Sequence, residues 1–288
     1  MFLKLIEKIQ DFARYDFEYA SSAIIDYVNN DNDFIESLKQ IAMIPESIDH
    51  DSTEEKLFSK ASDAILARAF REIGLKSTVL KERGDSADVI AKSPIYGYTL
   101  VADAKAFRMS RTAKNQKDFK ISALSGWRKE NDYAVLCSPY FQYPKNASQI
   151  YAQAIDHNVC LLSWEQLIFL IENKIKESTD LDFSLLWNFC DSYAHRVSAA
   201  DRKRCFLDKF NNTFLDVINR DNKHYHLFLN NQISTIKNRG DYEKKYWSAK
   251  IEEINNYSKE QAIIELIKSK KIIERLKQID VFIRGLRV

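Results

Sequence analysis

The order of helical and extended patterns in residues 52–174 constrains the fold more than any other feature of the sequence. These patterns follow one another as α-β-β-β-α-β-α-β-α. Strands interleaved with helices indicate a mixed sheet that is covered by helices on both faces. We therefore predict an α/β fold built on a mixed, α+β type of sheet. The extended segments are residues 77–81, 87–91, 98–105, 133–137 and 159–163.

Helical patterns flank this region on both sides. Apolar residues such as Leu5, Ile6 and Ile9 recur with helical spacing before it, and strand signals vanish after about residue 176. Scarce glycine and proline, six and four residues, also favour long helices. We predict three segments, namely an N-terminal helical segment, a core and a C-terminal helical region, at residues 1–50, 51–175 and 176–288.

Bulk composition narrows the class of protein but not its partners. The chain is 45% hydrophobic, which is enough for a sizeable core, and its net charge is only +2. The four cysteines are far apart and form no C-x-x-C pair, which is typical of reduced, buried thiols in a cytoplasmic protein. No window is apolar for long enough to span a membrane. We expect a cytoplasmic protein without a membrane partner.

Two opposite charges interrupt the apolar segment 98–105. Asp103 and Lys105 are two residues apart, so a strand would place both on one face, about 6.5–7 Å apart. Asp88 begins the preceding extended segment, and the Pro and Gly in residues 93–97 suit a hairpin between the two. Such a hairpin would bring Asp88 beside Asp103. The alternative is a partly buried ion pair at a strand end.

This arrangement suits metal-assisted hydrolysis of a phosphodiester. Mg²⁺ prefers oxygen ligands, typically one or two carboxylates together with water and substrate phosphate. Asp88, Asp103 and the backbone carbonyl of Ala104 are the predicted metal ligands, and Mn²⁺ is expected to substitute for Mg²⁺. Lys105 would orient or deprotonate the attacking water. An acid-x-Lys tripeptide is common in this chain, but only Asp103-Ala104-Lys105 is embedded in an apolar strand.

Two glutamates are further catalytic candidates. Glu55 begins the helix before the sheet and could bind a second metal, but it is also the third helical residue of a capping box that starts at Ser52. Glu82 lies just before the Asp88 segment and could approach the metal, or it could be an ordinary loop charge. Both interpretations stay open for each residue.

A basic run follows the charged strand. Residues 101–129 contain eight cations against two acids, and from Lys105 to Lys120 a cation recurs at every third position. Three residues turn a helix by about 300°, so these cations would wrap around a helix instead of forming one stripe. A loop leading into a helix, with cations on the phosphate backbone, fits better. Asn115 and Asp118 could bond base edges. The alternative is a solvated charged face.

The sequence resembles the HindIII-type restriction endonucleases, which have the PD-(D/E)xK nuclease fold. The resemblance rests on "STEEKLFSKA", "LVADAK", "SRTAKNQKDFK", "DYAVL", "FQYP" and "SWEQL", and is strongest over residues 52–189. It implies that Asp88 and Asp103 bind metal, that Lys105 is the motif lysine, and that Glu82 acts at the site. Ala87 replaces the proline of the motif name. Together with the basic run, it predicts DNA contacts by Arg108, Arg111, Thr112, Ala113, Lys114, Asn115, Lys117, Asp118 and Lys120.

The resemblance also implies a substrate and partners. It predicts Mg²⁺-dependent cleavage of double-stranded DNA at a palindromic hexanucleotide, AAGCTT, cut after the first A to leave 5′ overhangs. A palindrome implies a two-fold symmetric homodimer, and a restriction enzyme implies a companion DNA methyltransferase. The aromatic residues Tyr242, Tyr246 and Trp247 are interface candidates, with intrachain core as the preferred alternative.

Two other functions remain open at this stage. A structure-selective or repair nuclease with the same core would cut junctions or nicked DNA without a fixed sequence. A catalytically silent DNA-binding module would use the basic run alone. The acids of the charged strand argue against the silent module, because acids near phosphates weaken binding.

Overall fold

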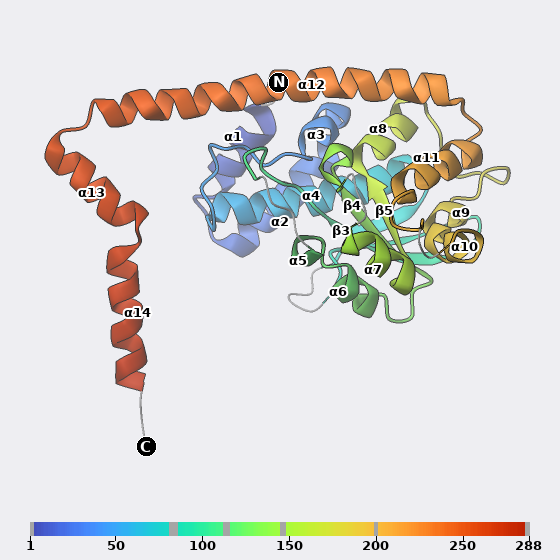
Figure 1. The fold of residues 1–288 in the computed structure, drawn as a ribbon, viewed down its shortest axis with the longest axis horizontal. Helices are drawn as coiled ribbons and strands as arrows, with labels where there is room; N and C mark the ends of the chain where they lie inside the picture. The colour runs from blue at the N-terminus through green and yellow to red at the C-terminus, as the bar shows by residue number, and fades with distance from the viewer. Residues whose placement is uncertain (1–2, 81–85, 112–115, 145–147, 199–200, 286–288) are drawn as a thin grey trace. The chain divides into compact units, whose positions relative to one another are not determined.

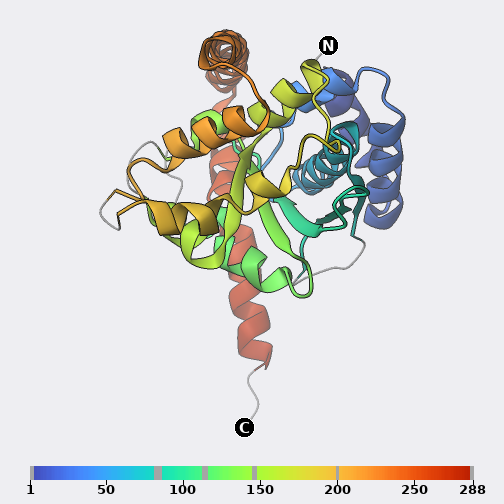
Figure 2. The same ribbon diagram turned by 90° about the vertical axis from the view of Figure 1, so that its right-hand side faces the viewer.

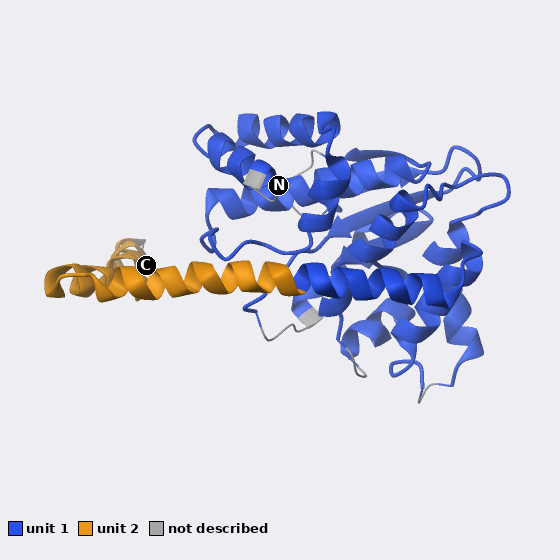
Figure 3. Cartoon of the chain, turned by 90° about the horizontal axis from the view of Figure 1, so that it is seen from above, with its two compact units in different colours: residues 1–236 blue, residues 237–288 orange. Residues whose placement is uncertain are grey.

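The computed structural model describes residues 3–80, 86–111, 116–144, 148–198 and 201–285. The chain forms two compact units, residues 1–236 and 237–288, which are coloured separately in Figure 3. The division into three segments made from the sequence pattern stays a prediction about domains.

A five-stranded mixed sheet is the centre of the first unit, and all five predicted strands are present. The strands lie side by side in chain order. The second strand runs antiparallel to both of its neighbours, and the last three strands are parallel. The strands are β1 (Lys76–Val79), β2 (Val89–Lys92), β3 (Thr99–Ala104), β4 (Tyr133–Ser138) and β5 (Val159–Ser163).

The long helix α4 (Thr53–Glu72) covers one face of the sheet, against β1, β2 and β3. The hydroxyl of Ser52 caps its first turn by accepting a hydrogen bond from the Glu55 backbone N–H at 3.1 Å. Gly74 ends it with a φ of +102° and lies so near the backbone of Glu177 that a Cβ there would be 3.3 Å from it. The helices α1 (Leu3–Phe12), α2 (Phe17–Asn30) and α3 (Phe34–Gln40) pack on α4.

The other face is covered by α6 (Ile121–Trp127) and α7 (Gln149–His157), which cross over between parallel strands. Consecutive right-handed crossovers place both helices on the same side, as Figures 1 and 2 show. The fold of this unit confirms the predicted mixed α/β class. The remaining elements of the unit are α5 (Gln116–Phe119), η1 (Tyr140–Gln142), α8 (Trp164–Glu172), α9 (Ser184–Trp187), α10 (Phe189–Arg196) and α11 (Phe206–Val217).

The helix that ends the basic run is interrupted. The sequence pattern over about residues 115–128 suits a single helix, but the structure has α5 and α6 with a break at Lys120. Lys120 has a φ of 49°, which is left-handed, so a helix cannot continue through it. The break lets Phe119 and Ile121 both be fully buried.

The second unit is formed by the end of α12 (Asn222–Asn255) with α13 (Lys259–Ser269) and α14 (Ile272–Gly285). Tyr242 and Trp247 are about half exposed, at 50% and 49%. The preferred interpretation of these aromatics as intrachain core is therefore wrong for both residues.

The cysteines are free thiols, and three of the four are buried, as predicted. Among the described residues, no helix combines the length and the apolar character needed to cross a membrane.

Candidate active site

The antiparallel pairing of β2 with β3 brings two predicted metal ligands together. Val89 is opposite Ala102 in the register, so the preceding residue, Asp88, lies opposite Asp103. The side chain of Asp88 is within hydrogen-bonding reach of the Asp103 carboxyl group. The predicted convergence of the two carboxylates is therefore present in the fold, although their binding of metal stays a prediction.

Lys105 lies on the same face as Asp103, as the strand spacing predicted. Its ammonium forms an ion pair with the Asp103 carboxylate. Its backbone is fixed on both sides, because its N–H donates to the Cys137 carbonyl at 2.8 Å and its carbonyl accepts from the Trp164 indole at 2.8 Å. Ala104, whose carbonyl is the third predicted ligand, is the last residue of β3 and is half-buried.

Asp103 is almost completely buried. Its side chain is 4% exposed. Burial raises the pKa of Asp103 above its ordinary value, Lys105 opposes this shift, and the nearby Asp88 adds to it. The Asp103 Oδ2 atom is the one that the Lys105 ammonium contacts.

A third carboxylate, Asp63, joins the cluster, and the sequence reasoning missed it. Asp63 is on α4 and is only 4% exposed. Burial raises its pKa well above the ordinary value, repulsion from Asp88 and Asp103 adds to the shift, and Lys60 opposes it. The Lys60 ammonium is 3.1 Å from an Asp63 oxygen and 3.8 Å from an Asp88 oxygen. The sequence signal was an acid within the apolar run "SDAILA".

The cluster fits a divalent cation. Three carboxylates, Asp63, Asp88 and Asp103, meet two ammonium groups, those of Lys60 and Lys105. The carboxylates therefore outnumber the balancing charges within a largely buried space. An all-oxygen donor set of this kind suits Mg²⁺.

Glu55 has other partners in the structure. Its carboxylate is 2.5 Å from the Arg108 guanidinium and 2.9 Å from a His50 ring nitrogen, and it accepts from the Asp51 N–H at 2.8 Å. Burial favours a higher pKa for Glu55, but these donors together lower it below the ordinary value. Glu55 precedes Asp63 by eight residues, or about 12 Å along the helix. Its catalytic role stays a prediction, and Glu82 lies outside the described residues.

His50, Asp51 and Glu55 bring their ligand atoms within 4.8 Å of one another. Because His50 and Asp51 are exposed and Glu55 is already paired with Arg108, we interpret this group as a cap on the start of α4 and not as a metal site.

The basic run begins as a loop after β3 and then enters α5, as predicted. Arg108 points inward, since its side chain is 17% exposed and also donates to the Ile48 carbonyl at 2.5 Å. Arg111 is 46% exposed and is 2.5 Å from Asp118. Lys117 and Lys120 are exposed. Their DNA contacts stay predictions, and Thr112, Ala113, Lys114 and Asn115 lie outside the described residues.

An aromatic cluster holds both ends of this run against the core. Phe107 and Phe119 pack edge to face with ring centroids 5.5 Å apart, and Phe119 stacks on Tyr143 at 5.8 Å. Phe107 follows the charged strand by two residues. The start of the basic run is therefore anchored two residues after Lys105 of the carboxylate cluster.

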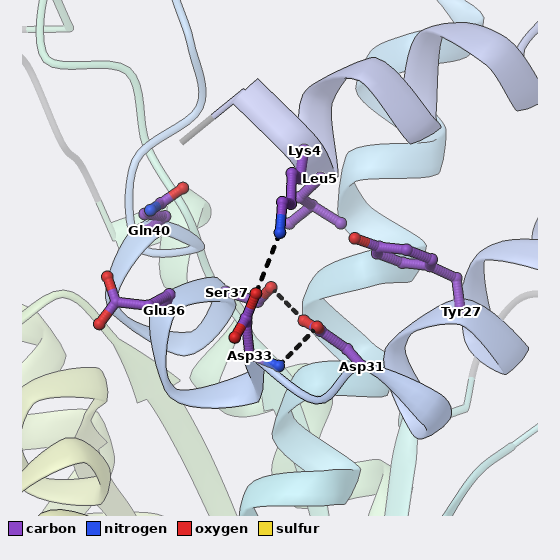
Figure 4. Close-up of a pocket in the computed structure, with 8 residues that line it drawn as sticks. All are labelled: Lys4, Leu5, Tyr27, Asp31, Asp33, Glu36, Ser37 and Gln40. Carbon is purple, nitrogen blue, oxygen red and sulfur yellow. Dashed lines mark hydrogen bonds and ion pairs between the residues drawn. The ribbon is translucent and has the colours of Figure 1, made fainter. Parts of the chain in front are cut away.

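A small cavity in the N-terminal helices is a separate feature. The Lys4 ammonium is 3.1 Å from Asp33, and the Ser37 hydroxyl donates to Asp31 at 2.6 Å; Figure 4 marks both contacts with dashed lines. The cavity has a volume of about 10 Å³, which is about enough for one water molecule. These polar contacts tie α3 to α1 and α2 and leave no space for a substrate.

Comparison with known proteins decides the family. Residues 7–283 match the family described as HindIII restriction endonuclease. The chain is also 42% identical over 286 residues to the type II restriction enzyme HindIII of Haemophilus influenzae, a match that covers 99% of this chain and 95% of the relative. The chain belongs to the HindIII restriction endonuclease family. This confirms the resemblance found in the sequence and makes the chain a restriction endonuclease, which is a DNA-cleaving enzyme.

Two solved structures are partly similar to this member of the HindIII family. The restriction endonuclease FokI is 14% identical with a TM-score of 0.35, and FokI bound to DNA is 16% identical with a TM-score of 0.32. Each match covers 56% of this chain and 31% of the FokI chain. At these TM-scores the similarity supports no conclusion about the present chain.

Proposed function

We propose that this protein is a type II restriction endonuclease that hydrolyses both strands of DNA at a palindromic hexanucleotide in a Mg²⁺-dependent reaction. The observation that carries the proposal is the convergence of Asp88, Asp103 and Lys105 at adjacent strand ends, in a chain that belongs to the HindIII restriction endonuclease family over nearly its full length. The sequence resemblance supports AAGCTT as the site, cut after the first A to leave 5′ overhangs.

Asp88 and Asp103, with the Ala104 carbonyl, would hold the metal. Bound there, Mg²⁺ (or Mn²⁺) would supply Lewis-acid polarisation of the scissile phosphate and acidify the attacking water. Lys105 would position that water and offset the negative charge that develops on the phosphate oxygens. Asp63 would keep Lys60 next to Asp88 and contribute a third carboxylate to the cluster. Glu55 and Glu82 remain further candidates for a role at the site.

DNA recognition would use the basic run. Exposed Lys117 and Lys120 would contact phosphates, and residues 112–115 would contribute to reading the bases. Asp118 would act through Arg111, because their ion pair directs a half-exposed guanidinium. A guanidinium held in this way can donate two parallel hydrogen bonds to guanine.

The palindrome would be read by a homodimer. A two-fold symmetric pair of chains places one active site on each strand of a two-fold symmetric sequence. A companion DNA methyltransferase would protect the same site in the host genome.

Digestion of plasmid DNA of known sequence tests the proposal. With purified protein and Mg²⁺, discrete fragments with uniform 5′ overhangs at AAGCTT are expected, and a duplex with one changed base pair in that site should stay intact. Cleavage confined to junctions or nicked duplexes would favour a structure-selective nuclease instead. Binding without cleavage, in Mg²⁺ and in Mn²⁺, would favour a DNA-binding module.

A further inference from the structure

The last two helices expose an apolar face, which we call the isoleucine face. Its aliphatic side chains come from α13 and α14 and are 38–62% exposed. Single exposed apolar residues are ordinary on a protein surface, but a stripe of several along one side of a helix usually marks an interaction site. The isoleucine face is formed by Ile263, Ile264, Leu266, Ile267, Ile272, Ile273, Leu276, Ile279 and Ile283.

The spacing on α14 makes this face continuous. Ile272, Leu276, Ile279 and Ile283 follow one another at intervals of four, three and four residues. At 100° per residue these four side chains lie within about 60° of one another around the helix. Val281, which is 69% exposed, lies on the opposite side of the same helix.

Neither helix has a core of its own. Among the described residues from 244 onward, no side chain is buried. The two helices are 11 and 14 residues long, which is marginal for a helix that lacks tertiary packing. Their apolar stripes would supply that packing if another surface covered them. A partner that buries the isoleucine face is therefore expected to stabilise the helices themselves.

We infer that a second copy of this chain covers the isoleucine face, with α14 of the two copies packed side by side in the same direction. The inference rests on the proposed function, which requires two active sites for the two DNA strands. Half-exposed aliphatic side chains supply roughly 50–100 Å² each, so the four of the α14 stripe supply roughly 200–400 Å² and all nine, with those of α13, roughly 450–900 Å². A stable dimer interface needs about 800 Å² per partner.

Charge complementarity supports the parallel arrangement. Arg275 and Asp280 flank the α14 stripe on its two opposite edges and are five residues apart. When two such helices pack in parallel about a two-fold axis, one edge of the first meets the other edge of the second. Arg275 of each copy would then face Asp280 of the other copy, which gives two ion pairs.

Two other occupants fit the face less well. A DNA backbone offers phosphates, which suit cations and not a stripe of isoleucine and leucine. An amphipathic helix for a membrane surface has a polar side rich in lysine and arginine, whereas here Glu265, Glu274 and Asp280 are interspersed among the cations.

Sedimentation equilibrium of the full chain tests the inference. The wild-type protein should be a dimer, and Leu276→Asp should raise its dissociation constant roughly 100-fold or more, because a carboxylate is poorly tolerated in a buried apolar seam. Val281→Asp adds the same charge to the opposite side of the same helix and should leave the constant unchanged. Circular dichroism of both variants checks that the rest of the chain is folded.

A charge reversal provides a second test. Asp280→Arg places like charges opposite each other and should weaken the dimer, while the double variant Arg275→Asp with Asp280→Arg should restore it. Unchanged dimerisation of Leu276→Asp would overturn the inference. A monomeric wild-type chain that binds vesicles of anionic lipid through this face would overturn it as well.

The inference and the proposed function fail separately. A dimer that depends on Leu276 but cuts no DNA would uphold the surface and reject the nuclease. Specific cleavage by a chain whose Leu276→Asp variant stays a full-strength dimer would uphold the nuclease and reject the surface.

Discussion

The carboxylate cluster and the isoleucine face depart from the usual distribution of residues in opposite ways. In the cluster, Asp63 and Asp103 are charged groups that the fold almost completely buries. On the face, residues such as Ile272 and Leu276 are large aliphatic groups left about half exposed. Both arrangements are unfavourable for an isolated chain, because buried carboxylates lose hydration and exposed aliphatic groups remain in water.

The difference shows what each region lacks. The cluster is short of positive charge, which a cation supplies, while the face is short of apolar contact, which a matching surface supplies. A small cation with oxygen ligands can balance the negative charge of the cluster. An extended apolar stripe needs the apolar surface of another helix. The first region therefore indicates chemistry, and the second indicates assembly.

The largest expected effect concerns Asp103. Asp103→Asn should reduce DNA cleavage by about 10³-fold or more, because the variant loses the carboxylate that would hold the metal. Binding to the specific duplex should persist, since the basic run is unchanged. Cleavage rates on plasmid DNA and binding measured in Ca²⁺ check this.

Asp191→Asn removes an exposed carboxylate from α10 and serves as the control, with wild-type cleavage expected. Cleavage by Asp103→Asn at the wild-type rate would remove the distinction between the two regions, because the buried charge would then have no catalytic role.

The next effect concerns Asp63, which the sequence did not single out. Asp63→Asn should slow cleavage by about 100-fold and raise the Mg²⁺ concentration needed for half-maximal rate, because Lys60 loses its position beside Asp88. Cleavage measured over a series of Mg²⁺ concentrations separates the two effects. An unchanged rate at every concentration would limit the functional cluster to Asp88, Asp103 and Lys105.

A smaller effect is expected from Glu165, a buried carboxylate of α8. Burial raises its pKa from 4.5 to about 7, against a hydrogen bond from the Tyr140 N–H. Between pH 4.5 and 7 the folded state thus binds more protons than the unfolded state, so this contribution to stability is complete below pH 4.5 and is lost as the pH rises through 7.

Glu165→Gln has no such titration and still accepts the hydrogen bond. It should be more stable than the wild type by on the order of 2 kcal/mol at pH 8 and lose that advantage near pH 4.5. Urea unfolding at the two pH values measures the difference. An equal difference at both pH values would mean that Glu165 keeps an ordinary pKa in the folded state.

The smallest effect concerns the isoleucine face. If a second copy covers it, the melting temperature of the wild-type protein should rise by a few degrees over a hundredfold increase in protein concentration. Ile272→Asn should reduce this dependence, while Val281→Asn, on the opposite side of α14, should preserve it. A wild-type melting temperature that does not depend on concentration would leave the face without a partner of its own kind.

Much of the fold was predictable because its signals are local. The five strands are short apolar runs bounded by turn residues, and the hairpin between β2 and β3 follows from the Pro and Gly of residues 93–97. The meeting of Asp88 with Asp103 follows from that hairpin, since register in an antiparallel pair is set by its connection. The shared face of Asp103 and Lys105 follows from the two-residue period of a strand.

The helical member of the cluster was not predictable in the same way. Sequence reasoning selected Glu55 on α4, whereas the fold brings Asp63 of the same helix to the sheet. A helical stripe of apolar residues marks one buried side, but α4 is buried on nearly every side through its middle turns. The pattern alone therefore gave no reason to expect that Asp63 is buried.

The basic run shows a similar limit. Six cations at intervals of three residues look equivalent in the sequence, yet Arg108 pairs with Glu55 and Arg111 with Asp118. Pairing depends on which carboxylates from other elements come near, and such contacts join residues up to 53 positions apart.

The sequence by itself determined the strands, the charged strand end and the family. The strands and their charges follow from the pattern of neighbouring residues, and the family follows from similarity along nearly the full length of the chain. Only the tertiary structure decided which carboxylates share the site, which cations are already paired, and which apolar residues remain exposed. These outcomes depend on contacts between distant segments, and the free energy of a buried charge or an exposed apolar stripe is set by its surroundings and not by its neighbours in the chain.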